Sequence, residues 1–227
     1  MRLWRIVPSL SLGAVSETVS RMSLNPTHEV RDRAVLSQDY FSLFGLQARF
    51  SIDVQALTQS WRRLQAAVHP DRFAGAGAAE QRLAMQWSTQ INAAYRTLLD
   101  PQARAAYLCE LRGVPIDAER NTAMPADFLM QQLQWREELD DARRAEDVGA
   151  MQMLSTVVGN AREQALSRLA ALLDPMGNNP ATVAWQDQAT REAATLVRML
   201  MFLDKFRQNL ALLLAPAAKN QSFISAA

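Results

Sequence analysis

The fold of this chain is decided by residues 53–73, DVQALTQSWRRLQAAVHPDRF, which contain one amphipathic helix and the corner where it must end. Asp53 is a suitable N-cap, and apolar residues follow at helical spacing, at positions 54, 57, 61, 64 and 68. The helix should end near His69, because the residue before a proline is pushed out of the α region and Pro70 has no N–H to donate. The side chains of His69, Pro70 and Asp71 are therefore expected to face solvent from a fixed corner.

A second long helix is predicted after the glycine-containing loop at residues 73–77. Its apolar residues are spaced by four, four, three and four positions, which places them on one face: Leu83, Trp87, Ile91, Ala94 and Leu98. Two helices of similar length joined by a short loop should pack antiparallel. A short helix at residues 41–46 precedes this pair. Asp100-Pro101 ends the second long helix and starts a flanking helix that runs to Gly113.

The rest of the chain predicts a second helical module. Residues 113–125 contain two prolines and a glycine and mark a boundary. Helices are predicted at residues 126–144, 147–173 and 182–214, and their short connections are typical of a bundle. Because Ala, Leu, Gln, Glu and Arg are abundant and β-branched runs are few, the predicted fold class is all-α. We expect a helical hairpin with short flanking helices, followed by a three-helix bundle.

Both ends of the chain lack sustained periodicity. We interpret residues 1–37 as a disordered extension or as the product of a start codon assigned too far upstream. They contain arginines and serines, as transit peptides do, but Glu17, Glu29 and Asp32 disfavour that interpretation. Residues 215–227 are expected to form a flexible tail.

Composition excludes several classes of function. The 24 basic and 23 acidic residues leave a formal net charge of +1, which provides no bulk attraction to nucleic acid or to an anionic membrane. No apolar run reaches the roughly 18 to 20 residues that span a bilayer. Cys109 is the single cysteine, so neither an internal disulfide nor a cysteine-rich metal site can form, and its apolar neighbours indicate a buried core residue. We predict no cofactor and no metal site.

An alternative is that His69 and Asp71 belong to a catalytic or metal site. Such a site needs more histidines or a nucleophile, and the only other histidine is His28, in the N-terminal extension. No glycine-rich phosphate loop is present. A helical DNA-binding regulator is the other class considered, and the near-neutral charge without a dense basic helix disfavours it. The residues therefore favour a non-catalytic protein that binds other proteins.

Several longer motifs occur in order along residues 38–214. They are DYFSLFGL (39–46), HPDRF (69–73), INAAYRTLLDP (91–101), FLM (128–130), REELDD (136–141) and VRMLMFLDKFR (197–207). Together they resemble the HscB family of J-type co-chaperones, which serve iron–sulfur cluster assembly. The HPD tripeptide alone would indicate no more than a J-domain. The REELDD and FLDKFR segments make the resemblance specific, because an ordinary J-protein need not contain them.

The resemblance implies a J-domain at residues 38–112, a linker at 113–125 and a scaffold-binding bundle at 126–214. The J-domain is expected to dock on an HscA-type relative of DnaK and to stimulate its ATPase. The residues that match the family's docking surface are His69, Pro70, Asp71, Arg62, Arg63 and Arg72. Ala66 and Ala67 stand where many J-domains have another basic residue, so we expect a thin basic patch. An ordinary solvated face is the alternative for Arg62 and Arg63.

The bundle is expected to carry an IscU-type iron–sulfur scaffold, mainly on its first helix. The matching residues are Leu129, Met130, Leu133, Gln134, Glu137, Asp141 and Phe202. They form an apolar patch that grades into an acidic one, although Gln134 replaces an acidic residue of the family. The alternative is that the four apolar residues are bundle core. Phe128, Trp135 and Leu139 already supply a core stripe, and leaving the four exposed forfeits roughly 1.5 to 3 kcal/mol each, which makes sense if a partner covers them.

Within the co-chaperone class, the alternative is a J-domain protein with a different client. A single cysteine fits a reducing compartment, so we expect the bacterial cytoplasm, with the mitochondrial matrix as the alternative location. No nucleic acid and no membrane is expected among the partners.

Overall fold

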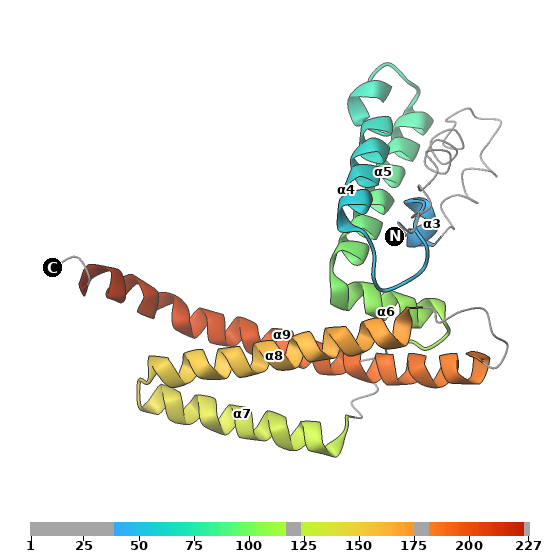
Figure 1. Cartoon of the computed structure of the whole chain (residues 1–227). Helices are drawn as coiled ribbons and strands as arrows, with labels where there is room; N and C mark the ends of the chain where they lie inside the picture. The colour runs from blue at the N-terminus through green and yellow to red at the C-terminus, as the bar shows by residue number, and fades with distance from the viewer. Residues whose placement is uncertain (1–38, 117–123, 175–181, 225–227) are drawn as a thin grey trace, which may run out of the picture. The chain divides into compact units, whose positions relative to one another are not determined.

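The computed structural model describes residues 39–116, 124–174 and 182–224 (Figure 1), and all regular structure within them is helical. The elements are α3 (Tyr40–Leu43), α4 (Val54–Ala67), the 3₁₀ helix η2 (Pro70–Phe73), α5 (Ala78–Leu99), α6 (Pro101–Leu111), α7 (Ala126–Arg144), α8 (Val148–Leu173) and α9 (Thr182–Ile224). The predicted all-α fold class is confirmed. The described residues form two compact units, residues 39–48 with 52–100 and residues 49–51 with 101–224. The expectations for residues 1–37 lie outside the described part of the chain.

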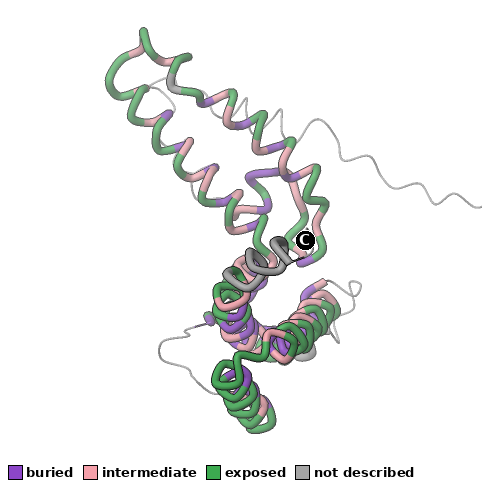
Figure 2. Tube along the Cα trace, turned by 90° about the vertical axis from the view of Figure 1, so that its left-hand side faces the viewer, coloured by how far each residue is buried: buried purple, intermediate pink, exposed green. Residues whose placement is uncertain are grey.

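The first unit is the predicted antiparallel hairpin of α4 and α5, with η2 and α3 packed against α5 (Figure 1). Asp53 caps α4 as predicted, because its Oδ1 accepts from the backbone N–H groups of Gln55 and Ala56 at 2.8 and 3.1 Å. Buried positions recur along both helices between exposed ones (Figure 2). The buried apolar residues of the pair are Leu57, Leu64 and Val68 before the corner, and Ala84, Trp87, Ile91, Ala94 and Leu98 on α5.

The apolar stripe of α4 is shorter than predicted. Val54 was expected to lie on it but is 44% exposed, because a side chain in the first turn of a helix has no preceding turn to shield it. Trp61 is half-buried and stacks on Tyr95, with ring centroids 4.6 Å apart. On α5, Leu83 is half-buried as well, although it lies in the second turn of the helix. The stripe that holds the hairpin together therefore starts at Leu57.

The short first helix ends earlier than predicted, at Leu43. Gly45 has φ +68°, in the left-handed region that glycine adopts at little cost, and its N–H donates to the Ser42 carbonyl. The N–H of Leu46 donates to the Phe41 carbonyl at 2.9 Å, which completes a Schellman C-cap. Leu46 consequently lies outside the helix.

The second unit is built on the long antiparallel pair of α8 and α9 (Figure 1). α6 packs against both helices, and α7 packs against α8. Two ion pairs join α8 to α9: Arg162 Nε lies 2.6 Å from Asp204 Oδ1, and Arg168 Nε lies 3.0 Å from Glu192 Oε1. The predicted bounds of α7 are confirmed, and α8 starts one residue later than predicted, at Val148, because Asp147 is its N-cap.

The end of α9 was predicted wrongly. Periodicity ended the helix at residue 214, whereas it continues to Ile224. A proline at position 216 does not end the helix, since a single proline inside a long helix can be accommodated with a local kink.

α6 packs with the C-terminal helices, although the sequence places it in the J-domain. The Sγ of Cys109, which is fully buried, lies 3.8 Å from the Thr190 carbonyl oxygen, and Arg112 Nη2 donates to the Leu173 carbonyl. At the end of α8, Asp174 Oδ1 accepts from the backbone N–H groups of Phe50 and Ser51 at 2.8 and 2.9 Å. These contacts show which helices α6 packs against. The domain boundaries at residues 112 and 126 remain a prediction.

The buried thiol of Cys109 leads to the first testable prediction. Burial raises the pKa of this thiol to about 11, so it stays protonated and shielded near neutral pH. Because the folded pKa lies above the unfolded one, the associated stability is fully present below pH about 9 and is lost as the pH rises toward 11. We expect iodoacetamide at pH 8 to leave native protein unmodified and to alkylate guanidinium-unfolded protein completely. The melting temperature between pH 8.5 and 10.5 should fall more steeply for the wild type than for Cys109→Ala, and parallel curves would contradict this prediction.

Candidate functional site

The tripeptide His69-Pro70-Asp71 forms a rigid turn directly after α4. His69 has extended backbone angles, φ −60° and ψ 132°, and is the N-cap of η2, with Pro70 in the first position of that helix. The Asp71 backbone N–H donates to His69 Nδ1 at 3.3 Å. The side chains of His69 and Asp71 are 57% and 89% exposed, respectively. The structure thus confirms the predicted exposure of His69 and Asp71.

Three arginines near this turn in the sequence are exposed. Arg62 and Arg63 lie on α4, and as neighbours on a helix they point about 100° apart around its axis. Arg63 Nη2 donates to Ser60 Oγ at 3.2 Å, and Arg72 Nη1 donates to the Ala66 carbonyl at 3.4 Å. Together with the tripeptide they form what we call the docking corner: His69, Pro70, Asp71, Arg62, Arg63 and Arg72. Their role in docking remains a prediction.

α7 presents two different faces. Its inner stripe is buried as predicted, with Phe128, Trp135 and Leu139 at most 7% exposed. Its outer side leaves three large apolar side chains in solvent: Leu129 (48%), Met130 (67%) and Leu133 (51%). Gln134, Glu137 and Asp141 follow them and are also exposed. We call these six residues the α7 face. Three of the four apolar side chains are therefore not bundle core.

Phe202 departs from the prediction, because it is half-buried instead of exposed. Its ring lies 5.9 Å from Phe128, 6.5 Å from Trp135 and 5.6 Å from Phe206, measured between centroids. The Arg136 guanidinium covers the ring at 5.5 Å from its centroid. An aromatic ring on α9 opposite the aromatic stripe of α7 gains packing energy in this cluster. Phe202 therefore packs on core residues while part of its ring stays exposed. Its role in binding remains a prediction.

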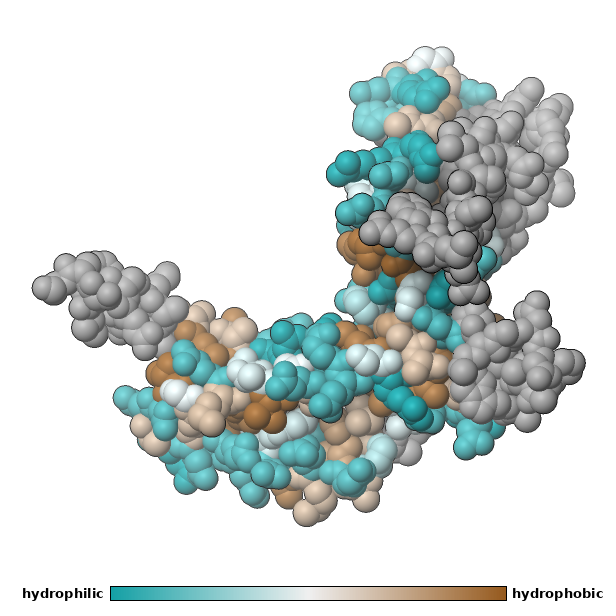
Figure 3. All heavy atoms as spheres, in the orientation of Figure 1, coloured by the Kyte–Doolittle hydropathy of each residue, from teal (hydrophilic) through white to brown (hydrophobic). Residues whose placement is uncertain are grey.

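The charged end of the α7 face is partly engaged within the helix. Gln134 Nε2 donates to Glu138 Oε1 at 2.8 Å, and Asp141 pairs with Arg144. Both contacts are solvent-exposed, so they cost little to break. The visible surface of this unit is mostly hydrophilic with separate hydrophobic patches (Figure 3). The α7 face thus combines apolar side chains with carboxylates that a partner can reach.

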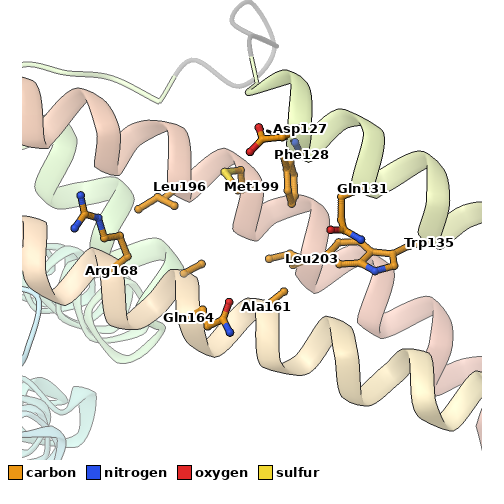
Figure 4. Close-up of a pocket in the computed structure, with 11 residues that line it drawn as sticks. Asp127, Phe128, Gln131, Trp135, Ala161, Gln164, Arg168, Leu196, Met199 and Leu203 are labelled. Carbon is orange, nitrogen blue, oxygen red and sulfur yellow. Dashed lines mark hydrogen bonds between the residues drawn. The ribbon is translucent and has the colours of Figure 1, made fainter.

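A groove of about 350 Å³ separates the first half of α7 from α8 and α9 (Figure 4). Its apolar lining includes Phe128, Trp135 and Leu203, while Gln131 and Gln164 lie among its polar residues. Sequence patterns did not predict it, because its lining comes from segments of three helices that are far apart in the sequence. On a helical wheel the groove lies on the side of α7 away from Leu129 and Leu133. Above this groove, α7 contacts α9 through the rings of Phe128, Trp135, Phe202 and Phe206.

Other kinds of site are not evident in the part of the chain that the structure describes. Among those residues, no group of three or more His, Cys, Asp or Glu side chains could hold a metal ion. None of the described helices is both long enough and apolar enough to cross a membrane. The docking corner and the α7 face are therefore the candidate functional sites.

Known proteins match both halves of this chain. The sequence profile of the HSCB C-terminal oligomerisation domain matches residues 124–211. The co-chaperone protein HscB homolog of Bordetella avium is 49% identical over 175 residues, which are 77% of this chain and 96% of that protein. The chain belongs to the HscB family. The homolog from Paraburkholderia phymatum is 47% identical over 172 residues, covering 76% of this chain and 91% of the relative.

Solved HscB structures also match this fold. Chaperone HscB from Vibrio cholerae superimposes with a TM-score of 0.61 at 31% identity, covering 81% of this chain and 99% of that one. Human co-chaperone protein HscB superimposes with a TM-score of 0.67 at 26% identity, covering 78% of this chain and 82% of the human one. The predicted membership and architecture, a J-domain followed by a helical bundle, are confirmed. This HscB-family chain is accordingly a co-chaperone of iron–sulfur cluster assembly.

Proposed function

We propose that this chain stimulates the ATPase of an HscA-type, DnaK-related chaperone through the docking corner and binds an IscU-type iron–sulfur scaffold through the α7 face. The observation that carries the proposal is the corner itself, where an 89% exposed Asp71 carboxylate stands on a turn fixed by Pro70 and by the His69 side chain. Membership of the HscB family supports the identity of both partners. We place this function in the bacterial cytoplasm, which the bacterial origin of these relatives supports.

The docking corner supplies binding energy, and the hydrolytic groups belong to the chaperone. Asp71 can accept charge-assisted hydrogen bonds from a partner arginine, each contributing roughly 1.5 to 3 kcal/mol. Arg62 and Arg63 can meet acidic groups beside it. A chain that binds one conformational state of an ATPase more tightly shifts the population toward that state by its difference in affinity. Stimulation follows if the favoured state is the one that hydrolyses ATP.

The α7 face supplies the contact to the scaffold. Leu129, Met130 and Leu133 are each about half-exposed or more, so a partner that covers them removes a contiguous apolar patch from water. Glu137 and Asp141 favour basic groups at the edge of the same contact. We therefore expect the scaffold to present an apolar depression next to lysine or arginine side chains.

One chain that carries both surfaces brings the scaffold to the chaperone. Binding of the scaffold to the α7 face turns its encounter with the chaperone into a step within one complex, at an effective concentration set by the chain. The chaperone then meets its client at the moment when hydrolysis is stimulated. The increase in the chaperone's ATPase rate with this chain and the scaffold together should therefore exceed the sum of the increases that each causes alone.

The test is the steady-state ATPase rate of the chaperone alone, with this chain, with the scaffold and with both. We expect this chain to stimulate the rate and the scaffold to increase that stimulation synergistically. Stimulation without any effect of the scaffold would overturn the client assignment and favour a different client. A rate that this chain leaves unchanged at saturating concentration would overturn the proposed function.

A further inference from the structure

A set of polar contacts runs along one side of the α4–α5 hairpin. Asn92 Oδ1 accepts from Trp61 Nε1 at 3.0 Å and from Gln65 Nε2 at 2.9 Å. Gln65 Nε2 also donates to the Ser88 carbonyl at 3.3 Å, and Gln65 Oε1 accepts from Ser88 Oγ at 3.2 Å. Tyr95 stacks on Trp61. These five residues, all half-buried, form what we call the amide ladder.

The ladder can be satisfied in only one orientation. The indole N–H of Trp61 can only donate, so Asn92 must turn its amide oxygen toward it. Gln65 must then present its NH₂ group to that same oxygen, which directs its own oxygen to the Ser88 hydroxyl. Both ends of the Gln65 amide are therefore used. A shift of α4 along α5 or a rotation about its axis would break several of these bonds at once, because hydrogen bonds weaken steeply with distance and angle.

The apolar contacts between the helices impose a weaker constraint. Leu57, Leu64 and Val68 pack on α5 through non-directional contacts, which tolerate small changes of register. Partly buried polar pairs are known to specify register in helical assemblies at some cost in stability. The ladder therefore adds a directional constraint on the register of α4 to the packing of the core.

The ladder lies next to the docking corner. Trp61 and Gln65 are four residues apart on one face of α4, and His69 follows Gln65 by four residues in the sequence, just beyond the end of the helix. Arg62 directly follows Trp61, and α4 ends at Ala67, so Gln65 lies in the last turn before the corner. We propose that the amide ladder is a positioning device for chaperone docking, which holds Arg62, His69 and Asp71 in the arrangement that the chaperone recognises. This inference rests on the proposed function of the corner.

The expected effect of losing the ladder is a loss of apparent affinity, not of maximal stimulation. If α4 keeps the correct register about one-tenth of the time, the apparent affinity for the chaperone falls about tenfold, because only that fraction is competent to bind. Once bound, the corner makes the same contacts. The maximal rate at saturating co-chaperone should therefore be retained.

The test compares Asn92→Leu with Asn92→Asp in the full chain. Asn92→Leu removes the shared acceptor, whereas Asn92→Asp keeps an oxygen for both Trp61 and Gln65. Gln86→Leu, exposed on the opposite side of α5, is the matched control for adding apolar surface. In titrations of the chaperone ATPase, we expect Asn92→Leu to raise the half-maximal concentration about tenfold. Asn92→Asp and Gln86→Leu should both stay within about twofold of the wild type.

A second readout does not depend on the chaperone. The backbone amide resonances of His69 and Asp71 should shift in Asn92→Leu and stay near their wild-type positions in Asn92→Asp, while far-UV circular dichroism is unchanged in both. Two results would overturn the positioning role. One is a half-maximal concentration for Asn92→Leu equal to that of the wild type. The other is an increase no larger than the fraction of unfolded Asn92→Leu protein would itself cause. If the wild type itself fails to stimulate, the proposed function is overturned, and unshifted corner resonances would then overturn the ladder separately.

Discussion

Asp71→Asn is expected to remove most of the ATPase stimulation while leaving the helix content unchanged. The substitution keeps the shape of the side chain but removes the charge from a carboxylate that is 89% exposed and forms no part of the hairpin core. Loss of a charge-assisted hydrogen bond worth roughly 1.5 to 3 kcal/mol corresponds to a stimulation about 10 to 150 times weaker at limiting concentration. The measurement is the chaperone's steady-state rate as a function of co-chaperone concentration, together with far-UV circular dichroism.

Asp53→Asn is the matched control for this variant. Asp53 is also an exposed aspartate at a helix start, but asparagine caps helices about as well as aspartate does, and Asp53 is not in the docking corner. We expect this control to stimulate like the wild type, and His69→Gln to fail like Asp71→Asn. Full stimulation by Asp71→Asn would remove the tripeptide from the mechanism.

The double substitution Leu129→Ala with Leu133→Ala is expected to weaken scaffold binding strongly without lowering the melting temperature. These side chains are 48% and 51% exposed, so the folded chain loses little packing when they are shortened. At a central apolar contact, truncations that together cost about 2 to 4 kcal/mol raise the dissociation constant roughly 30- to 1,000-fold. Isothermal titration calorimetry with the scaffold and thermal unfolding of the free chain measure the two quantities.

Three single variants separate binding from stability. Trp135→Ala, 4% exposed, should unfold several degrees lower, since removing a buried aromatic side chain costs about 3 to 5 kcal/mol. Met153→Ala, 72% exposed on α8, should change neither quantity. Phe202→Ala should lower both, because the ring packs in the aromatic cluster. A large drop in melting temperature for the leucine pair would instead support the alternative that these residues are bundle core.

The two sites could be predicted from sequence to different degrees. The corner depends on a proline and on residues within one helical turn of it, so its exposure follows from local rules. The inner and outer stripes of α7 follow from helical spacing, which correctly separated Trp135 from Leu133. Helical spacing on α7 does not predict how deeply a side chain from another helix is buried against it. For that reason the half-burial of Phe202, on α9, was missed.

Local sequence rules were sufficient for the all-helical fold, the cap at Asp53 and the turn at Pro70, because each depends on neighbours within a few residues. The sequence motifs also indicated the HscB family, because their order along the chain is specific to it. The amide ladder, the packing of α6 with α8 and α9, and the groove beside Trp135 depend on which side chains meet across helices. Gln65 and Asn92 are ordinary polar residues in the sequence, and they become partners only when folding brings α4 and α5 together. Their pairing is a property of the packed hairpin, because hydrogen-bond geometry is satisfied only at one register of the two helices.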